Sequence, residues 1–138
     1  MPDDQYLETQ VMTASPLQLH LMVVDGAIRF AKHAMQALHE SDIETAHSSL
    51  NKSRDFVSEL IGGLRPDHAP ELVDRLKGLF LFVHRSLVNA DLNRDPTQVA
   101  DALKVLELHR DASVKLIDKL RQQNSTEAAG KRETSWTT

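Results

Sequence analysis

Cysteine is absent from this sequence, and glycine and aromatic residues are scarce. The 138 residues include five glycines, four phenylalanines, one tyrosine and one tryptophan. Without cysteine the chain has no disulfide and no thiolate metal site. Few glycines and aromatics argue against a turn-rich β fold and favour helices. The length is that of one domain, large enough to bury a core without cross-links.

The chain also lacks a surplus of basic charge and any long hydrophobic run. Its formal net charge is −4, whereas a general nucleic-acid binder needs a basic stripe that neutralises phosphates. Residues 1–4 are acidic and polar, unlike the basic and then apolar start of a secretory signal, and no apolar run reaches membrane-spanning length. We therefore expect a soluble cytoplasmic protein with no nucleic-acid partner and no membrane insertion.

Residue patterns typical of catalysis or metal binding are missing as well. The seven histidines contain no pair four residues apart and no HExxH pattern, so no preformed zinc site is expected. No nucleophile elbow, glycine-rich phosphate loop or paired-carboxylate site is visible. The sequence predicts a protein that is not an enzyme, with no cofactor and no metal, whose histidines lie on solvated helix surfaces.

Four segments carry apolar residues at alternating steps of three and four, which places them on one face of a helix. The stripes run through residues 17–38, 43–64, 72–90 and 99–120. Their joints are short, and short joints force neighbouring helices to run antiparallel. The predicted fold is all-α, an antiparallel up-down four-helix bundle.

Local signals mark the ends of these helices. Ser15 can cap the first free amides of the first helix, and Pro16 suits its first position because it has no N–H to lose. Ser41 and Glu44 have the spacing of a capping box before the second helix. Gly62 and Gly63 give an end signal for it. Asp95-Pro96 repeats the cap-plus-proline start for the fourth.

The bundle is predicted to span residues 15–123, between an arm and a tail. Residues 1–14 form an N-terminal arm that is more apolar than a solvated end needs, so it should lie on the protein's own body or on a partner. Residues 124–138 are rich in Ser, Thr, Glu, Lys and Arg and have no apolar period. We predict that this C-terminal segment is a disordered tail.

Asp25-Gly26 stands in the middle of the first predicted helix. Glycine costs about 1 kcal/mol relative to alanine there, so it needs a tertiary reason. The simplest reason is that Gly26 lets another helix approach closely. Asp25 has two possible partners, Arg29 one turn on or a basic group on a neighbouring helix.

The third helix is apolar around more than one face. Its extra apolar residues are Phe80, Leu81, Phe82, Leu87 and Val88. Either this helix is buried in the centre of the bundle, or it offers a hydrophobic groove to an amphipathic helix of a partner. The residues by themselves leave both interpretations open.

Two stretches carry a family resemblance. Residues 6–30, YLETQVMTASPLQLHLMVVDGAIRF, contain a tyrosine, a Val-x-Thr-Ala-x-Pro step and a Leu-rich helix that ends in Asp-Gly-Ala-Ile. Residues 79–91, LFLFVHRSLVNAD, form a looser second match. In both, the chain resembles the FliS family, cytoplasmic chaperones that hold flagellin before flagellar export. The resemblance covers about residues 6–120.

The chain departs from the family pattern at four aromatic positions. Val24 stands where the family usually has a tyrosine, and Ser113 where it has a tryptophan. Phe80 and Phe82 replace tyrosines. These changes bear on client contacts and leave the helical pattern intact.

The resemblance implies a chaperone, a monomer or weak homodimer, that binds the disordered C-terminal region of flagellin. It would prevent premature polymerisation and deliver its client to the type III export apparatus, at the gate protein FlhA. With the resemblance, we favour the groove over the buried helix. The candidate partner-binding residues are Tyr6, Leu7, Val11, Met12, Phe80, Phe82, Arg85, Leu87 and Val88.

Two other classes of function stay open: a histidine phosphotransfer domain and an adaptor bundle without a client. Phosphotransfer domains of this shape carry an exposed histidine followed by small residues, usually Lys-Gly. Here His47 is followed by Ser48-Ser49-Leu50, without the glycine. The chaperone is therefore the preferred interpretation.

Overall fold

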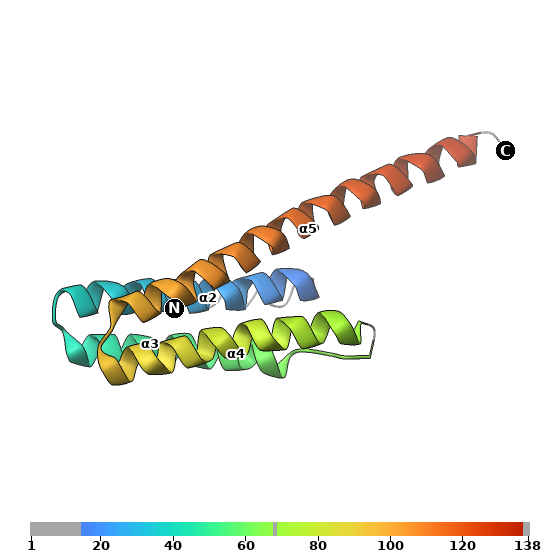
Figure 1. The fold of residues 1–138 in the computed structure, drawn as a ribbon. Coiled ribbons are helices and arrows are strands. Elements are labelled where there is room, and N and C mark those ends of the chain that lie inside the picture. The colour runs from blue at the N-terminus through green and yellow to red at the C-terminus, as the bar shows by residue number, and fades with distance from the viewer. Residues whose placement is uncertain (1–14, 68, 137–138) are drawn as a thin grey trace, which may run out of the picture.

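The computed structural model describes residues 15–67 and 69–136, and within them the chain forms four helices and no strand. They are α2 (Pro16–His39), α3 (Ile43–Gly62), α4 (Pro70–Asn93) and α5 (Pro96–Trp136). Helices α2, α3 and α4 lie side by side, and the first half of α5 packs on α2 and α4 (Figure 1). The predicted up-down four-helix bundle is confirmed. The predicted N-terminal arm lies outside the described residues.

The first helix begins where local chemistry places it. The Ser15 side chain accepts a hydrogen bond from the Gln18 N–H at 3.2 Å, and the Gln18 side chain accepts one from the Ser15 N–H at 3.0 Å. This reciprocal capping box satisfies two amides that the helix leaves free. Pro16 occupies the first position. The predicted start is confirmed.

The start of α3 differs from the prediction by one residue. Asp42, not Ser41, is the N-cap, and its carboxylate accepts a hydrogen bond from the Thr45 N–H at 3.2 Å. The capping box predicted for Ser41 and Glu44 is therefore wrong. Ser41 instead has a φ of 59°, the left-handed conformation that turns the chain between α2 and α3. The end predicted at Gly62 is confirmed, with Gly63 as the C-cap.

The core takes apolar side chains from all four helices. Small residues line α2, with Ala27, Ala31 and Ala34 fully buried, so neighbouring helices approach closely. Leu50 of α3 and Leu106 of α5 are fully buried in the core between the helices. Helix α4 contributes the larger side chains of Phe80, Val83 and Leu87 to this core.

Gly26 has the tertiary reason that its position predicted. A Cβ atom there would lie 2.8 Å from Cζ of Phe56, so the Phe56 ring of α3 occupies the space of the missing side chain. The Phe56 ring also stacks on Phe30, with centroids 5.9 Å apart. The predicted close approach of another helix is confirmed.

Helix α5 extends beyond the end of the bundle. Ser113 is its last buried residue among the described side chains, and from there the helix projects away from the other three (Figure 1). The predicted disordered tail differs from the structure here, because residues 124–136 continue α5. Helix-forming residues such as Glu127 and Ala129 permit this extension without any packing.

Removing residues 124–138 is expected to leave the melting temperature almost unchanged. The described side chains of this segment are exposed, and changes at exposed sites usually alter the free energy of unfolding by no more than about 0.5 kcal/mol. Thermal unfolding followed by circular dichroism tests this. Truncation after Glu107, which also removes the buried Ser113, is the matched control and should lower the melting temperature. A similar loss in both truncations would mean that the end of α5 packs on the bundle.

Candidate functional site

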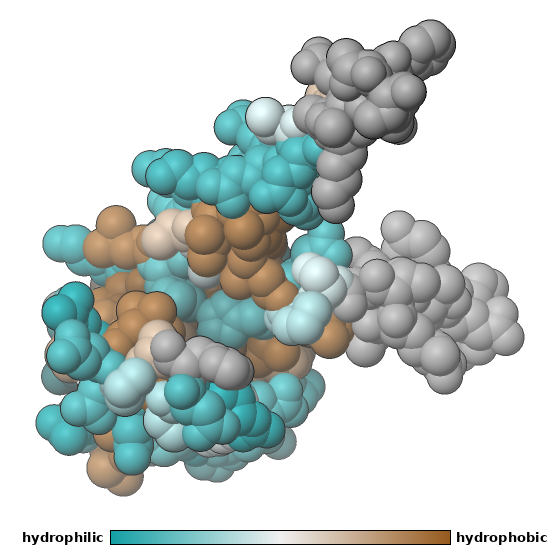
Figure 2. All heavy atoms as spheres, turned by 90° about the vertical axis from the view of Figure 1, so that its right-hand side faces the viewer, coloured by the Kyte–Doolittle hydropathy of each residue, from teal (hydrophilic) through white to brown (hydrophobic). Residues whose placement is uncertain are grey.

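Seven of the eight exposed large apolar side chains among the described residues lie on α4 and α5, namely Leu72, Leu81, Phe82, Leu92, Leu108, Leu116 and Leu120. Four of them define what we call the α4–α5 surface. They are Leu72 at 54% exposure, Phe82 at 46%, Leu116 at 47% and Leu120 at 43%. Figure 2 looks onto the end of the bundle from which α5 projects and shows hydrophobic atoms beneath α5, bordered by hydrophilic ones. Such a patch, rimmed by polar groups, is typical of a binding surface.

The helical register explains why these side chains are exposed. Leu72 shares a stripe with the buried Val83, and Leu120 shares one with the buried Leu106, fourteen positions earlier. Along the bundle both stripes are covered. Beyond Ser113 α5 has left the bundle, so the last part of each stripe lacks its neighbour. Leu72 and Leu120 are thus uncovered continuations of core stripes, whereas Phe82 lies beside the stripe of α4.

The beginning of α4 borders an open hollow. It has a volume of about 470 Å³ and is lined by Ala69, Pro70, Glu71, Leu72 and Arg75. Leu72 gives it an apolar wall, and Glu71 and Arg75 give it charges of both signs. A partner side chain can enter here beside the α4–α5 surface.

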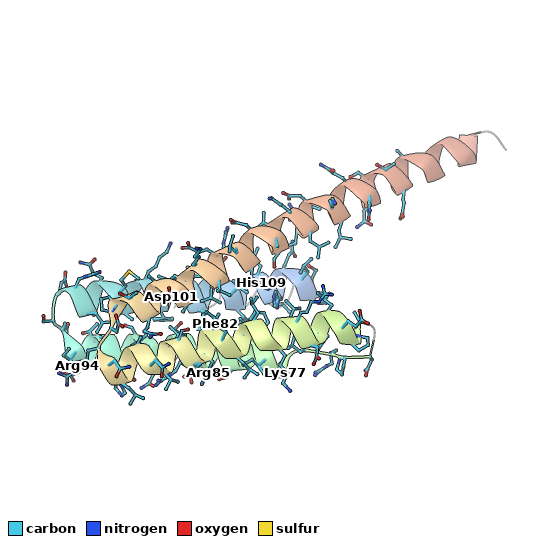
Figure 3. All side chains as sticks on the ribbon, viewed as in Figure 1. Lys77, Phe82, Arg85, Arg94, Asp101 and His109 are labelled. Carbon is cyan, nitrogen blue, oxygen red and sulfur yellow. The ribbon has the colours of Figure 1, made fainter. Side chains whose placement is uncertain are left out.

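The structure divides the predicted residues of α4 between core and surface. Phe80 and Leu87 are fully buried, so in this conformation they stabilise the bundle and offer no surface to a partner. Phe82 lies toward α5, and Arg85 lies about 60° further round α4, away from α5 (Figure 3). Arg85 is exposed and Val88 is partly buried. The predicted residues of α4 therefore do not form one patch.

The four predicted contacts of the arm are outside the described residues: Tyr6, Leu7, Val11 and Met12. Two surface residues, in turn, were predicted as core, and a third was not predicted at all. Leu72 and Leu120 belong to predicted core stripes, and Leu116 adjoins one. The sequence held one signal of the change, since Arg110 and Ser113 interrupt the fourth stripe just before α5 leaves the bundle.

Ion pairs hold α5 against α2 along the bundle. The Arg110 Nε donates to the Asp25 carboxylate at 2.6 Å, and Lys32 lies 3.4 Å from Glu107. The hydrogen bond to Asp25 raises the pKa of Arg110. Of the two predicted partners of Asp25, the basic group on a neighbouring helix is the one observed. The same charges line an open hollow of about 570 Å³ between the helices.

His47 ties α3 to α4. Its Nδ1 lies 2.8 Å from a carboxylate oxygen of Asp91, which Arg54 also approaches at 3.4 Å. The amide of Asn51 lies 3.3 Å from Nε2 of the same ring. Both ring nitrogens therefore have protein partners, and a phosphoryl group on Nε2 would have to displace Asn51. This geometry gives the phosphotransfer interpretation no support beyond the exposure of His47.

A second histidine contact lies where α5 leaves the bundle, and no pattern in the sequence indicates it. The Nε2 atoms of His20 on α2 and His109 on α5 are 2.7 Å apart. Phe80 packs beneath them, with its centroid 5.1 Å from that of His109. The prediction of solvated histidines is wrong for this pair, because both are partly buried.

Within the described residues, no group of three histidines or carboxylates is arranged to hold a metal ion. Nor does any helix of the described part combine the length and hydropathy needed to cross a membrane.

Comparisons with known proteins agree with this fold. The family model described as flagellar protein FliS matches residues 2–120. The flagellar secretion chaperone FliS of Bacillus subtilis is 29% identical over 111 residues, which cover 80% of this chain and 82% of that protein. Its counterpart from Salmonella typhimurium is 29% identical over 96 residues, or 69% of this chain and 71% of that protein.

Solved structures show the same architecture. A bacterial flagellar chaperone known from a crystal structure superposes with a TM-score of 0.72 at 20% identity, covering 86% of this chain and 99% of that one. At this identity the likeness concerns the fold alone. The family match extends over most of the sequence, including both stretches that carry the motifs. The chain therefore belongs to the FliS family of flagellar secretion chaperones.

Proposed function

We propose that this protein is a cytoplasmic export chaperone for flagellin. It binds the disordered C-terminal region of flagellin, prevents premature polymerisation and delivers the client to the type III export apparatus through FlhA. The observation that carries the proposal is the α4–α5 surface, where two core stripes run on without a neighbour. The family membership supplies the class of client.

The physical mechanism is coupled folding and binding. A disordered segment with amphipathic stretches can fold as helices on this surface and cover the side chains that α5 leaves exposed. Interfaces of this kind typically bury roughly 1,000–3,000 Å² and spend about 2–5 kcal/mol of interaction energy on ordering the client. The resulting moderate affinity suits a cargo that must be released at the export gate.

Spacing along the helices supports a helical client. Leu116 and Leu120 are one turn apart on α5, so they can pack against residues one turn apart on an incoming helix. Leu72 and Phe82 on α4 add further exposed apolar side chains. We include Phe82 among the contacts and retain Arg85 as a charged contact outside this surface.

Co-expression with the flagellin of the same organism tests the proposal directly. We expect the two proteins to co-purify as a 1:1 complex, measured by native mass spectrometry, with the free chaperone a monomer or weak dimer. Flagellin lacking its C-terminal region is the matched control and should not co-purify. If full-length flagellin fails to bind, or binds equally without that region, the proposal is wrong.

Deleting residues 1–12 is expected to strengthen flagellin binding. We propose that the apolar arm, with Tyr6 as its main anchor, covers the client's site and acts as an intramolecular competitor. The apparent affinity is then reduced in proportion to the fraction of molecules in which the arm leaves the site uncovered. Deleting the arm makes this fraction one and restores the full affinity. The bundle should stay folded, because Ser15 and Pro16 still begin α2.

Isothermal titration with the C-terminal flagellin peptide measures the effect of the deletion. A polar replacement of the arm's apolar residues, without deletion, controls for the change in chain length and should give the same gain. Weaker binding would show instead that the arm contacts the client. Unchanged affinity would reduce the arm to a structural cap.

A further inference from the structure

The contact between His20 and His109 joins α2 to α5 at the last point where α5 still belongs to the bundle. Figure 3 places His109 on the side of α5 that faces the other helices. Four residues later comes Ser113, the last buried residue among the described side chains of α5, whose hydroxyl donates to the His109 carbonyl at 2.9 Å. Beyond it lies the α4–α5 surface. The histidine pair therefore lies at the point where α5 begins to project from the bundle.

The two rings are held in a restricted arrangement. Their planes are nearly perpendicular, at 82°, with centroids 5.0 Å apart. Phe80 closes the space below, with centroid distances of 6.2 Å to His20 and 5.1 Å to His109. An Nε2–Nε2 distance of 2.7 Å requires one nitrogen to donate its N–H and the other to accept it.

Burial favours the neutral form of both rings. Desolvation lowers the pKa of His20, and desolvation together with repulsion from His20 lowers the pKa of His109 to about 4. Both values lie below the ordinary 6.5. Since the unfolded chain binds these protons more readily, the pair stabilises the fold fully above about pH 6.5 and loses this effect as the pH falls towards 4.

The charged groups around the pair do not offset this effect. On α2 the nearest is Asp25, and next to His109 on α5 is Arg110, and these two are paired with each other. On α4, Lys77 and His84 lie one turn before and after Phe80. After desolvation, repulsion from His20 is the charge effect that lowers the pKa of His109.

We propose that the hydrogen bond between His20 and His109 is a latch that sets where α5 leaves the bundle, and that it opens when both imidazoles are protonated. Protonation of one of the two imidazoles leaves the hydrogen bond intact, because the charged ring still donates to the neutral one. A second proton removes the acceptor and places two N–H groups and two positive charges face to face. The part of α5 around His109 then separates from α2.

Opening the latch would change the α4–α5 surface. Leu116 and Leu120 lie two and three turns beyond His109 on the same helix, so a change in the direction of α5 moves them relative to Leu72 and Phe82. This consequence for the client rests on the proposed function. If the binding arrangement falls to about one fifth of the molecules, the dissociation constant for flagellin rises about fivefold.

Distance measurements between spin labels test the latch without any client. The chain has no cysteine, so K77C on α4 and K119C on α5, both at exposed positions, can be labelled selectively. We expect a narrow distance distribution at pH 7.5 and a broader, longer one at pH 4. Circular dichroism must show that helix is retained at pH 4.

Three variants in the labelled background make the test specific. His109→Gln should keep the narrow distribution at pH 4, because its amide oxygen accepts a hydrogen bond from a charged His20. His109→Ala removes the bond and should broaden the distribution already at pH 7.5, which decides the question even if acid unfolds the wild type. His39→Gln, at an exposed histidine, should behave as the wild type does.

A distribution for His109→Ala as narrow as that of the wild type at pH 7.5 would overturn the latch. Binding of the flagellin C-terminal peptide to this variant at pH 7.5 separates the two proposals. About fivefold weaker binding than to the wild type supports control of the client site. Equal binding despite a broadened distribution overturns that control alone. If neither protein binds the peptide, the proposed function fails while the distance result stands.

Discussion

Replacing Phe80 with alanine is expected to lower the free energy of unfolding by about 3–5 kcal/mol, the usual cost of removing a buried aromatic ring. Phe80 is fully buried on α4 and packs against His20 and His109. Its loss would leave a cavity below the histidine pair, which the close-packed core cannot fully close. Urea unfolding followed by circular dichroism measures the difference.

Phe82→Ala is the matched control, since it removes the same ring two positions along the same helix. Phe82 remains half exposed, so this change is expected to cost less than about 1 kcal/mol. Equal losses for the two variants would mean that Phe82 is buried in solution, by the arm or by a second copy of the chain. That outcome would also remove Phe82 from the α4–α5 surface of the free protein.

Replacing Leu120 with aspartate is expected to weaken binding of the flagellin C-terminal peptide about thirtyfold. A buried anchor at an interface often contributes 2 kcal/mol or more, and about 2 kcal/mol corresponds to this factor. The charge would sit on the uncovered part of the α5 stripe, where an apolar client helix could not solvate it. Leu116→Asp should act in the same direction.

Leu108→Asp provides the control on the same helix. Leu108 is exposed but lies on a different face of α5 from Leu106 and Leu120, as the helical register requires. Binding to this variant should equal that of the wild type, and all three aspartate variants should keep the wild-type melting temperature. Isothermal titration decides the matter: equal affinity for Leu120→Asp and Leu108→Asp would mean that the client does not use the α4–α5 surface.

The helix pattern and most helix ends could be predicted because the forces behind them are local. Ser15 and Gln18 satisfy each other three residues apart, and Pro16 requires no distant partner. Asp42 took the N-cap from Ser41 because either side chain suits that position. Such an error moves a helix end by one residue and leaves the bundle unchanged.

The candidate site could be predicted only in part. Phe80 and Phe82 are both apolar residues on a helix that is apolar around much of its circumference, so periodicity does not separate them. Packing does: the core encloses Phe80, and Phe82 faces outward beside α5. In the same way, the stripe through Leu106 and Leu120 is continuous in sequence, although the bundle covers only its first half.

The sequence by itself determined the four helices, their antiparallel order and the family, because these depend on residues within a few positions of one another and on motifs written along the chain. Only the tertiary structure decided that Asp25 pairs with Arg110, 85 positions away, and that His20 meets His109, 89 positions away. It also decided where α5 leaves the bundle and so which apolar residues remain uncovered. Contacts over such separations depend on how whole helices pack, which no local pattern records.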